Sequence, residues 1–337
     1  MVKRRHGEVA LIAGGPPCQG YSGRGIRSTF KDLQRAEVPS NYLYREMSKV
    51  ISAVGPRMFL FENVAGLETA RWTKDGEQGE IWRDVMRTFR RVRVQKGTKK
   101  LGYRLEPLVV RSRDYAVPQN RPRLLLVGIR EDINTGEGIS FFPAPTFGAP
   151  DLIDLLGDLM DPKMTNGGAT TTYPHEVTSD VQRFFRTDRN GKTLRKGAAL
   201  TEHEYAFHSE VVLRRYSAMI KSGGDIPSEL MTKKFGQRLL PKRWTNTGPS
   251  ITATSAPDDY VHFAQPRILT VREWARLQTF PDSYSFVGKR TTGGRRRAGD
   301  PSLGIWDREL PKYTQIGNAV PVQLARALGL HFRTLVG

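Results

Sequence analysis

The amino-acid sequence predicts an α/β protein in which a smaller, irregular domain is inserted into a larger one. Before residue 130, short apolar runs typical of strands alternate with segments of helical periodicity. Residues 150–250 are rich in threonine, glycine and charge and show no regular alternation, which returns only from Leu269. We therefore expect the larger domain to consist of residues 1–144 and 261–337, and the smaller one of residues 145–260.

Each expected element has a local reason. The first apolar run stops at Gly14-Gly15-Pro16-Pro17, which is typical of a buried parallel strand and its exit turn. The first helix stops at Gly55-Pro56. Apolar residues at 81, 85, 89 and 92 have the spacing of an amphipathic helix. In chain order we expect a strand at 9–13, a helix at 45–54, a strand at 58–61, a helix around 81–92, strands at 105–110 and 124–129, helical patches at 151–160 and 211–221, and helices at 271–279 and 320–335.

Composition excludes several classes of protein. The chain has 337 residues, of which 38% are hydrophobic, and no stretch approaches the ~20 apolar residues that span a bilayer. Its first residues lack the long apolar core and cleavage site of a signal peptide. The single cysteine excludes an intramolecular disulfide and a multi-cysteine zinc site. We therefore expect neither a membrane protein nor a secreted disulfide scaffold, but a cytoplasmic protein.

The net charge predicts a polyanionic partner. The chain has 53 basic and 34 acidic residues, a net charge of +19 and an isoelectric point near 10.2. Residues 87–100 contain seven basic residues and no acidic one, and further basic clusters lie at 24–35 and 289–297. Any one cluster could be a solvated face. Together with the net charge, the three clusters favour contact with phosphates.

Chemically capable side chains follow two of the expected strands. Cys18 comes directly after the first strand, and Glu62-Asn63 ends the second, where α/β sheets bind their ligands. A buried structural thiol and a helix-capping carboxyl are the plainer alternatives. Arg121 and Arg123 precede a third strand and would point to one side if extended. Together these groups fit one reaction. The thiolate would add to an electron-poor ring, the acid would support a ring nitrogen, and the arginines would hold a carbonyl and a phosphate.

Five stretches, in a fixed order, make the chain similar to the DNA (cytosine-5)-methyltransferases. They are GGPPCQGYS at residues 14–22, FENVAGL at 61–67, YAVPQNRPR at 115–123, LTVREWARLQTFPD at 269–282 and QIGNAVP at 315–321. The resemblance covers residues 7 to 333. It implies a Rossmann-like methyltransferase sheet with an inserted target-recognition domain, duplex DNA as the partner, and S-adenosyl-L-methionine as the cofactor.

The resemblance also implies a mechanism. A cytosine is flipped out of the duplex, Cys18 attacks its C6 atom, and Glu62 interacts with N3. C5 then takes the methyl group, loses its proton and releases Cys18. Asn63 would brace this site, and Arg121 and Arg123 would hold the base and its flank.

Further roles are implied by the same resemblance. Gln119 would support the arginine loop. Arg272 would contact DNA or fix the inserted domain to the catalytic one. The residues implied to contact the cofactor are Pro17, Asn318, Ala319 and Val320, and those implied to contact DNA include Gln19, Ser22, Arg24, Arg27 and Lys31.

One part of the family pattern is missing. The family opens with a glycine-rich cofactor turn and an acidic residue for the ribose, and neither precedes Cys18 nor follows Pro321. We therefore expect the sheet to be incomplete at its N-terminal end. We also expect methyl transfer to need an N-terminal partner subunit or an upstream segment.

Three alternatives remain open at this point. The chain could be a DNA-binding remnant without catalysis, since the basic clusters would serve that role equally well. It could methylate tRNA, although its inserted region is larger than that branch of the family usually has. A metal site built from His203 and His208 is disfavoured, because a spacing of five residues does not place them on one helix face.

Overall fold

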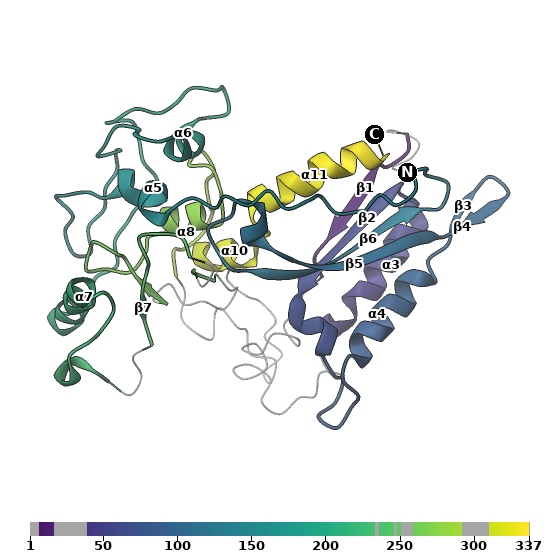
Figure 1. Ribbon diagram of the computed structural model, residues 1–337, viewed down its shortest axis with the longest axis horizontal. Helices are drawn as coiled ribbons and strands as arrows, with labels where there is room; N and C mark the ends of the chain where they lie inside the picture. Colours follow the sequence, from purple (N-terminus) through teal and green to yellow (C-terminus); the bar gives the residue numbers. More distant parts are fainter. Residues whose placement is uncertain are drawn as a thin grey trace. The chain divides into compact units, whose positions relative to one another are not determined.

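The computed structural model describes residues 7–16, 39–232, 236–245, 248–250, 259–291 and 310–336. It divides into two compact units, each described here by itself (Figure 1). Unit 1 consists of Met1–Arg111, Pro122–Pro145 and Arg326–Gly337, and unit 2 of Ser112–Arg121 and Thr146–Ala325.

These units divide the chain differently from the expected domains. Residues 261–325, expected in the larger domain, cluster with the inserted region instead. The physical reason is a shared apolar core, in which Leu155 and Leu156 of the insert pack with Trp274 and Ile316. The change in sequence character therefore does not coincide with a boundary of the packed core.

Unit 1 contains a four-stranded mixed sheet in the order β1-β2-β6-β5. β1 runs parallel to β2, whereas β6 is antiparallel to both β2 and β5. Its elements are β1 (Leu11–Gly14), α3 (Leu43–Val54), β2 (Met58–Val64), α4 (Glu80–Arg90), β3 (Val94–Lys96), β4 (Lys99–Leu101), β5 (Tyr103–Arg111), β6 (Pro122–Arg130) and most of α11 (Val322–Val336). The expected strands and helices of this part are confirmed, but the helix around 81–92 ends at Arg90 and is followed by the β3–β4 hairpin.

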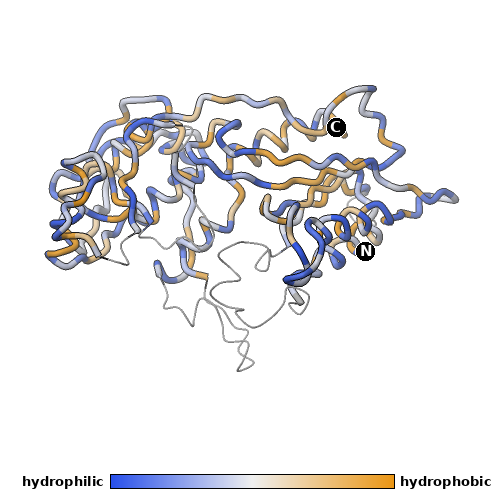
Figure 2. The backbone as a smooth tube through the Cα atoms, turned by 60° about the horizontal axis from the view of Figure 1, so that its bottom comes forward, coloured by the Kyte–Doolittle hydropathy of each residue, from blue (hydrophilic) through white to orange (hydrophobic). Residues whose placement is uncertain are grey.

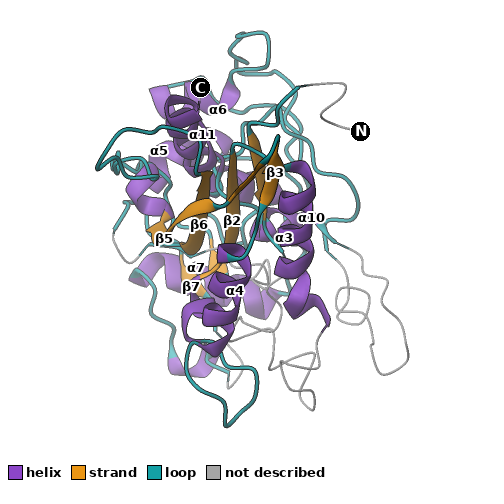
Figure 3. Cartoon of the chain, turned by 90° about the vertical axis from the view of Figure 1, so that its right-hand side faces the viewer, coloured by secondary structure: helices purple, strands orange, loops and turns teal. Residues whose placement is uncertain are grey.

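The core of unit 1 forms between the sheet and the helices α3 and α4, which lie on the same side of it (Figures 1 and 3). Ile51 of α3 and Phe89 of α4 are fully buried, and Phe89 stacks on Phe59 of β2 with ring centroids 5.2 Å apart. Gly55 ends α3 in the left-handed region at φ 62°, a conformation that glycine adopts without steric cost. Apolar periodicity and one glycine thus place α3 and α4 against the sheet.

Strand β1 departs from its predicted environment. It is parallel to β2 as expected, but it lies at the edge of the sheet and is not buried. Leu11 is 37% exposed and Ala13 is exposed as well. Within the described residues β1 pairs with β2 alone, and an apolar strand of a parallel pair is usually covered on both sides.

Unit 2 has little regular structure. Its elements are α5 (Leu152–Leu156), α6 (Asp180–Arg186), α7 (Glu210–Ser222), β7 (Arg238–Leu239), β8 (Tyr260–Val261), α8 (Val271–Leu277) and α10 (Lys312–Asn318). The guanidinium of Arg276 is fully buried between the carboxylates of Asp158, 2.5 Å away, and Asp282, 2.6 Å away. Paired buried charges therefore join segments that lie far apart in sequence. Among the described helices of the whole chain, none is long and apolar enough to cross a membrane.

Candidate functional site

Glu62 and Arg123 form an ion pair at the carboxyl end of β2. The guanidinium Nε of Arg123 lies 2.8 Å from Oε1 of Glu62, and both side chains are mostly buried. The antiparallel register explains the contact, since Arg123 of β6 pairs with Val64, two residues beyond Glu62 on the same strand face. The structure thus brings together two of the residues that the sequence singled out.

Asn63 points to the other face of β2, as the period of a strand requires. Its amide nitrogen donates to the carbonyl of Pro16 at 3.2 Å, and its amide oxygen accepts from the backbone of Val64 at 2.9 Å. Asn63 therefore holds the exit of β1, and its two hydrogen bonds go to the backbone of Pro16 and Val64.

The Glu62 carboxylate also lies close to the exit of β1. A Cβ placed on Gly15 would stand 2.9 Å from Oε2 of Glu62, a distance that real Cβ atoms essentially never show. Gly15 is therefore the residue that permits this approach. One carboxylate oxygen meets Arg123 while the other faces the segment that leads toward Cys18.

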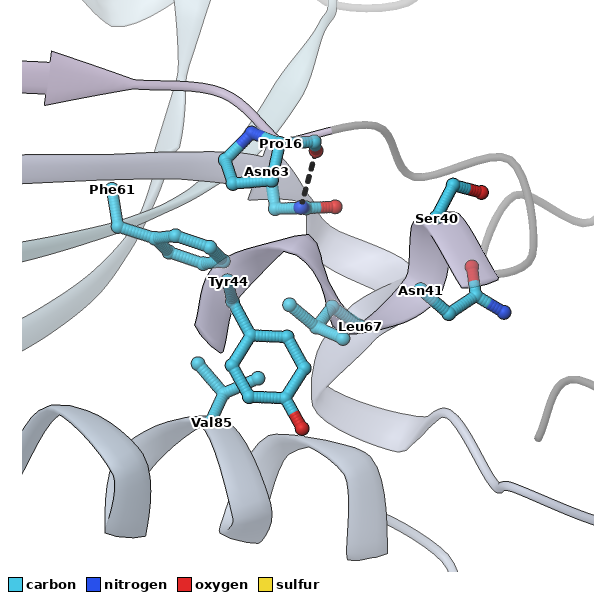
Figure 4. Close-up of a pocket in the computed structure, with 8 residues that line it drawn as sticks. All are labelled: Pro16, Ser40, Asn41, Tyr44, Phe61, Asn63, Leu67 and Val85. Atoms are coloured by element: carbon cyan, nitrogen blue, oxygen red, sulfur yellow. Dashed lines mark hydrogen bonds between the residues drawn. The ribbon is translucent and has the colours of Figure 1, made fainter. Parts of the chain in front are cut away.

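A small hollow lies on the Asn63 side of these strand ends (Figure 4). It is lined by Pro16, Ser40, Asn41, Tyr44, Phe61, Asn63, Leu67 and Val85, and it leaves essentially no room for a water molecule. Burial and the neighbouring Asp84 carboxylate raise the pKa of Tyr44, which stays neutral and donates to Asp84. Ligand pockets usually measure ~300–1,000 Å³, so this hollow by itself is not a ligand pocket.

Gln119 and Arg121 belong to unit 2, where they hold the loop after β5. Gln119 donates to the carbonyl of Leu277 at 2.9 Å and to the side chain of Gln278. Arg121, only 2% exposed, donates to the carbonyls of Gly317 and Ala319. Gln119 was expected to support the arginine loop, and these two hydrogen bonds hold its side chain in unit 2.

Arg121 and Arg123, expected to point to one side and to hold the base and its flank, have different partners in this structure. The two guanidiniums have partners in different units, because Arg121 donates to carbonyls of unit 2 and Arg123 pairs with Glu62 of unit 1. Since Arg121 is buried on those carbonyls, it positions the backbone of Gly317 and Ala319.

The predicted cofactor residues Asn318, Ala319 and Val320 lie at the end of α10. Asn318 is exposed, and Ala319 and Val320 are half-buried. Gln278 donates to the carbonyl of Ala319 at 2.9 Å and fixes this turn together with Arg121. Gln278 thus has a positioning role that sequence reasoning missed, although it lies within the LTVREWARLQTFPD stretch.

Arg272, which the resemblance implied to contact DNA or to fix the inserted domain, lies inside unit 2. Arg272 is fully buried, and its guanidinium donates to the side chain of Thr201 at 3.0 Å and the carbonyl of Tyr284 at 3.1 Å. It therefore joins α8 to the inserted region, which is the alternative role that its motif implied. Burial would raise the pKa of the neighbouring Glu273, but the buried Arg267 guanidinium, 2.7 Å away, lowers it below the ordinary value.

An open hollow in unit 2 carries exposed cations that the sequence motifs do not include. It measures about 710 Å³ and is lined by Glu176, Val177, Arg183, Lys192, Thr193 and Arg195. In this irregular region, the local density of charged residues was the one sequence feature that could have indicated these cations. The remaining predicted site residues lie outside the described residues: Pro17, Cys18, Gln19, Ser22, Arg24, Arg27 and Lys31.

His203, considered above as a metal ligand, is buried with both ring nitrogens close to protein oxygens. It is buried, its Nε2 lies 2.9 Å from the carbonyl of Leu159, and its Nδ1 lies 2.9 Å from the hydroxyl of Thr270. Desolvation lowers its pKa to about 4. In the part of the chain that the structure describes, no group of three or more His, Cys, Asp or Glu side chains could hold a metal ion.

A family model described as C-5 cytosine-specific DNA methylase matches residues 3–332. The chain belongs to this family. It is 28% identical over 338 residues to the type II methyltransferase M.DdeI of Desulfomicrobium norvegicum, covering 95% of this chain and 72% of the relative. It is 29% identical over 328 residues to the type II methyltransferase M1.HphI of Haemophilus parahaemolyticus, covering 96% and 68%.

A solved structure shows the same fold. It is an E. coli protein encoded within a prophage and described as a DNA modification methyltransferase, with a TM-score of 0.62 and 20% identity. The match covers 99% of this chain and 82% of that one. The expected α/β methyltransferase fold, the family resemblance and the enzyme class, a DNA (cytosine-5-)-methyltransferase, are thereby confirmed.

Proposed function

We propose that this methylase transfers a methyl group from S-adenosyl-L-methionine to C5 of a cytosine that is flipped out of duplex DNA. The observation that carries the proposal is the placement of the Glu62 carboxylate, held by Arg123 at 2.8 Å and lying against Gly15. Cys18 follows Gly15 by three residues. Glu62 thus stands near the end of β2, and Cys18 follows the adjacent parallel strand β1 by four residues in the sequence.

The chemistry assigns one role to each of these side chains. The thiolate of Cys18 forms a bond to C6 as the C5–C6 double bond opens, and the carboxyl group of Glu62 gives a proton to N3, where the negative charge would otherwise collect. C5 then gains the methyl group and loses its proton to water, Glu62 takes back the proton from N3, the bond between Cys18 and C6 breaks, and the aromatic ring is restored. Because Oε1 of Glu62 meets Arg123, its Oε2 is the oxygen assigned to N3.

The cofactor supplies the methyl group when it is bound. The residues beside Asn63 and Pro16 offer an apolar wall and polar side chains, as an adenosyl group requires, but the hollow between them is too small to hold one. We assign Pro17, Asn318, Ala319 and Val320 to further contacts with the cofactor.

A further polypeptide segment completes the cofactor site in this proposal. Its support is the apolar edge strand β1, which pairs with β2 alone within the described residues and leaves Leu11 37% exposed. A strand added at this edge would cover Leu11 and extend the parallel part of the sheet. The segment is either another subunit or another part of the same polypeptide.

Duplex DNA is the assigned substrate. The exposed side chains of Arg183, Lys192 and Arg195 line one hollow in the region expected to recognise the target, where they would meet phosphates. Gln19, Ser22, Arg24, Arg27 and Lys31 are assigned to the same duplex.

Tritium release from [5-³H]cytosine in mixed-sequence duplex DNA tests the proposal without any cofactor. Addition of the thiolate at C6 makes C5 basic, so its hydrogen exchanges with water whether or not a methyl donor is present. We expect release by the wild type, none by Cys18→Ser, and a loss of about 10²–10⁴-fold in Glu62→Gln. Glu46→Gln is a matched control, because Glu46 is an exposed carboxylate paired with Lys49.

Two results would overturn the proposal. If the wild type releases no tritium, the chain is a DNA-binding protein without this catalysis. If Cys18→Ser releases tritium as fast as the wild type, another group is the nucleophile. Faster release from tRNA than from duplex DNA would reassign the substrate.

A further inference from the structure

The cationic residues between 87 and 100 gather at the end of unit 1 opposite to Glu62 and Asn63. We propose that this far-end basic surface, formed by Arg87, Arg90, Arg91, Arg93, Lys99 and Lys100, binds the sugar-phosphate backbone of duplex DNA. The choice of DNA as the occupant rests on the proposed function, whereas binding itself needs no catalysis.

The direction of α4 shows where the far-end basic surface lies in unit 1. Val85 lines the hollow beside Asn63, whereas Phe89, one turn later, stacks on Phe59. The helix therefore runs toward the amino end of β2 and ends there at Arg90. Met58 and Asn63, at the two ends of that strand, are about 17 Å apart at ~3.3 Å per residue.

The β3–β4 hairpin extends the same end of the sheet (Figure 1). Tyr103, which follows the hairpin, pairs with Arg130 at the end of β6, and its hydroxyl donates to the carbonyl of Pro56 at 2.7 Å, just before β2. Figure 2 shows the outer end of this extension as mostly hydrophilic. Its cations thus project from the amino end of β2, away from the proposed catalytic residues.

Within the described residues, most of these charges have no carboxylate beside them. Among the described residues no carboxylate lies within 4 Å of the charged nitrogens of Arg90, Arg91, Lys99 or Lys100. Lys96, by contrast, lies 2.6 Å from Asp132, and Arg87 lies 3.8 Å from Asp84. In a chain with a net charge of +19, unpaired clustered cations repel one another, and a phosphate backbone offsets that cost.

Most of the cations lie on regular secondary structure, namely helix α4 and the β3–β4 hairpin. Ile81, Val85 and Phe89 are buried on the opposite face of α4, which leaves its arginines in solvent. In the hairpin, Lys99 pairs with Lys96 and Lys100 with Gln95. A surface held in this way can follow a row of phosphates at little cost in side-chain ordering beyond the cations themselves.

The salt dependence of binding to a labelled 40-base-pair duplex of mixed sequence tests the proposal. Each phosphate contact contributes ~0.9 to the slope of log K against log salt. In the variant Arg90→Gln, Arg91→Gln, Lys99→Gln, Lys100→Gln we expect that slope to fall by about 2–4. The smaller variant Lys99→Gln, Lys100→Gln should lose about half as much, and the melting temperatures should stay near that of the wild type.

A matched control removes four other cations of unit 1. The variant Lys49→Gln, Arg83→Gln, Arg326→Gln, Arg333→Gln has the same net charge and alters exposed residues elsewhere. An unchanged slope in the far-end variants, or an equal fall in the control, overturns the proposal. Tighter binding of duplex RNA, with the loss confined to RNA, overturns DNA as the occupant. Tritium release is measured in a separate assay. If the wild type releases no tritium but the slope still falls in the far-end variants, the proposed function fails while DNA binding by this surface is supported.

Discussion

Arg123 and Glu62 meet across the β2–β6 strand pair, with Nε of the guanidinium 2.8 Å from Oε1 of the carboxylate. Both side chains are less than one fifth exposed, so the pair is shielded from water and the guanidinium determines where the acid points. The pair lies beside Gly15, at the exit of the strand that precedes Cys18.

Replacing Arg123 should therefore impair the reaction more than the fold. For Arg123→Gln we expect tritium release or methyl incorporation to fall by about 10–100-fold, because Glu62 loses the partner that orients it. Arg83→Gln, which removes an exposed arginine from an ion pair with Glu77, is the control. Full activity of Arg123→Gln would show that Glu62 needs no such partner.

The close approach of Gly15 to Glu62 predicts a second effect on activity. In Gly15→Ala the new methyl group would stand 2.9 Å from Oε2, so the carboxylate must shift. We expect a loss of activity of about tenfold or more with little change in melting temperature, because the displaced group is a side chain at the end of a strand. Equal loss of activity and of thermal stability would instead indicate a backbone rearrangement.

Glycine at position 128 has a packing role. A Cβ there would lie 2.1 Å from the ring of Phe59 on the neighbouring strand, within the core of the sheet. We expect Gly128→Ala to lower the free energy of unfolding by about 1–3 kcal/mol, measured by urea denaturation. Gly329→Ala, on an exposed position of α11 with nothing within 4 Å, should instead raise it by about 0.5–1 kcal/mol.

The buried Arg276 predicts a large loss of stability. Arg276→Met leaves the carboxylates of Asp158 and Asp282 buried without their shared cation. We expect the free energy of unfolding to fall by about 3–5 kcal/mol. The exposed pair of Arg183 and Asp180, 3.6 Å apart, provides the comparison, since Arg183→Met should cost less than about 1 kcal/mol.

The depressed pKa of His203 predicts a pH dependence of stability. Its folded-state pKa of about 4 lies below the ordinary 6.5, so between these values the unfolded chain binds a proton that the folded chain does not. Stability must then fall as the pH falls, by about 2 kcal/mol between pH 7 and pH 5 from this group. His203→Gln should show a shallower pH dependence of unfolding than the wild type, and parallel curves would contradict the assignment.

Much of unit 1 could be predicted from local sequence. The strands at 58–61, 105–110 and 124–129 and the helix at 45–54 are confirmed, because apolar periodicity and the stops at glycine and proline are properties of neighbouring residues. The exposure of β1 could not be read in this way. An apolar run looks the same whether one or two strands flank it.

By itself the sequence determined the family, the alternation of strands and helices, and the placement of Glu62 at a strand end, because motifs and periodicities are local patterns. The tertiary structure alone decided the partners: Arg123 meets Glu62, Arg121 holds the carbonyls near Ala319, and Arg272 is buried. A charged side chain binds a nearby group of opposite polarity. For Arg123 and Arg121 these groups belong to distant parts of the sequence, and only folding brings them close.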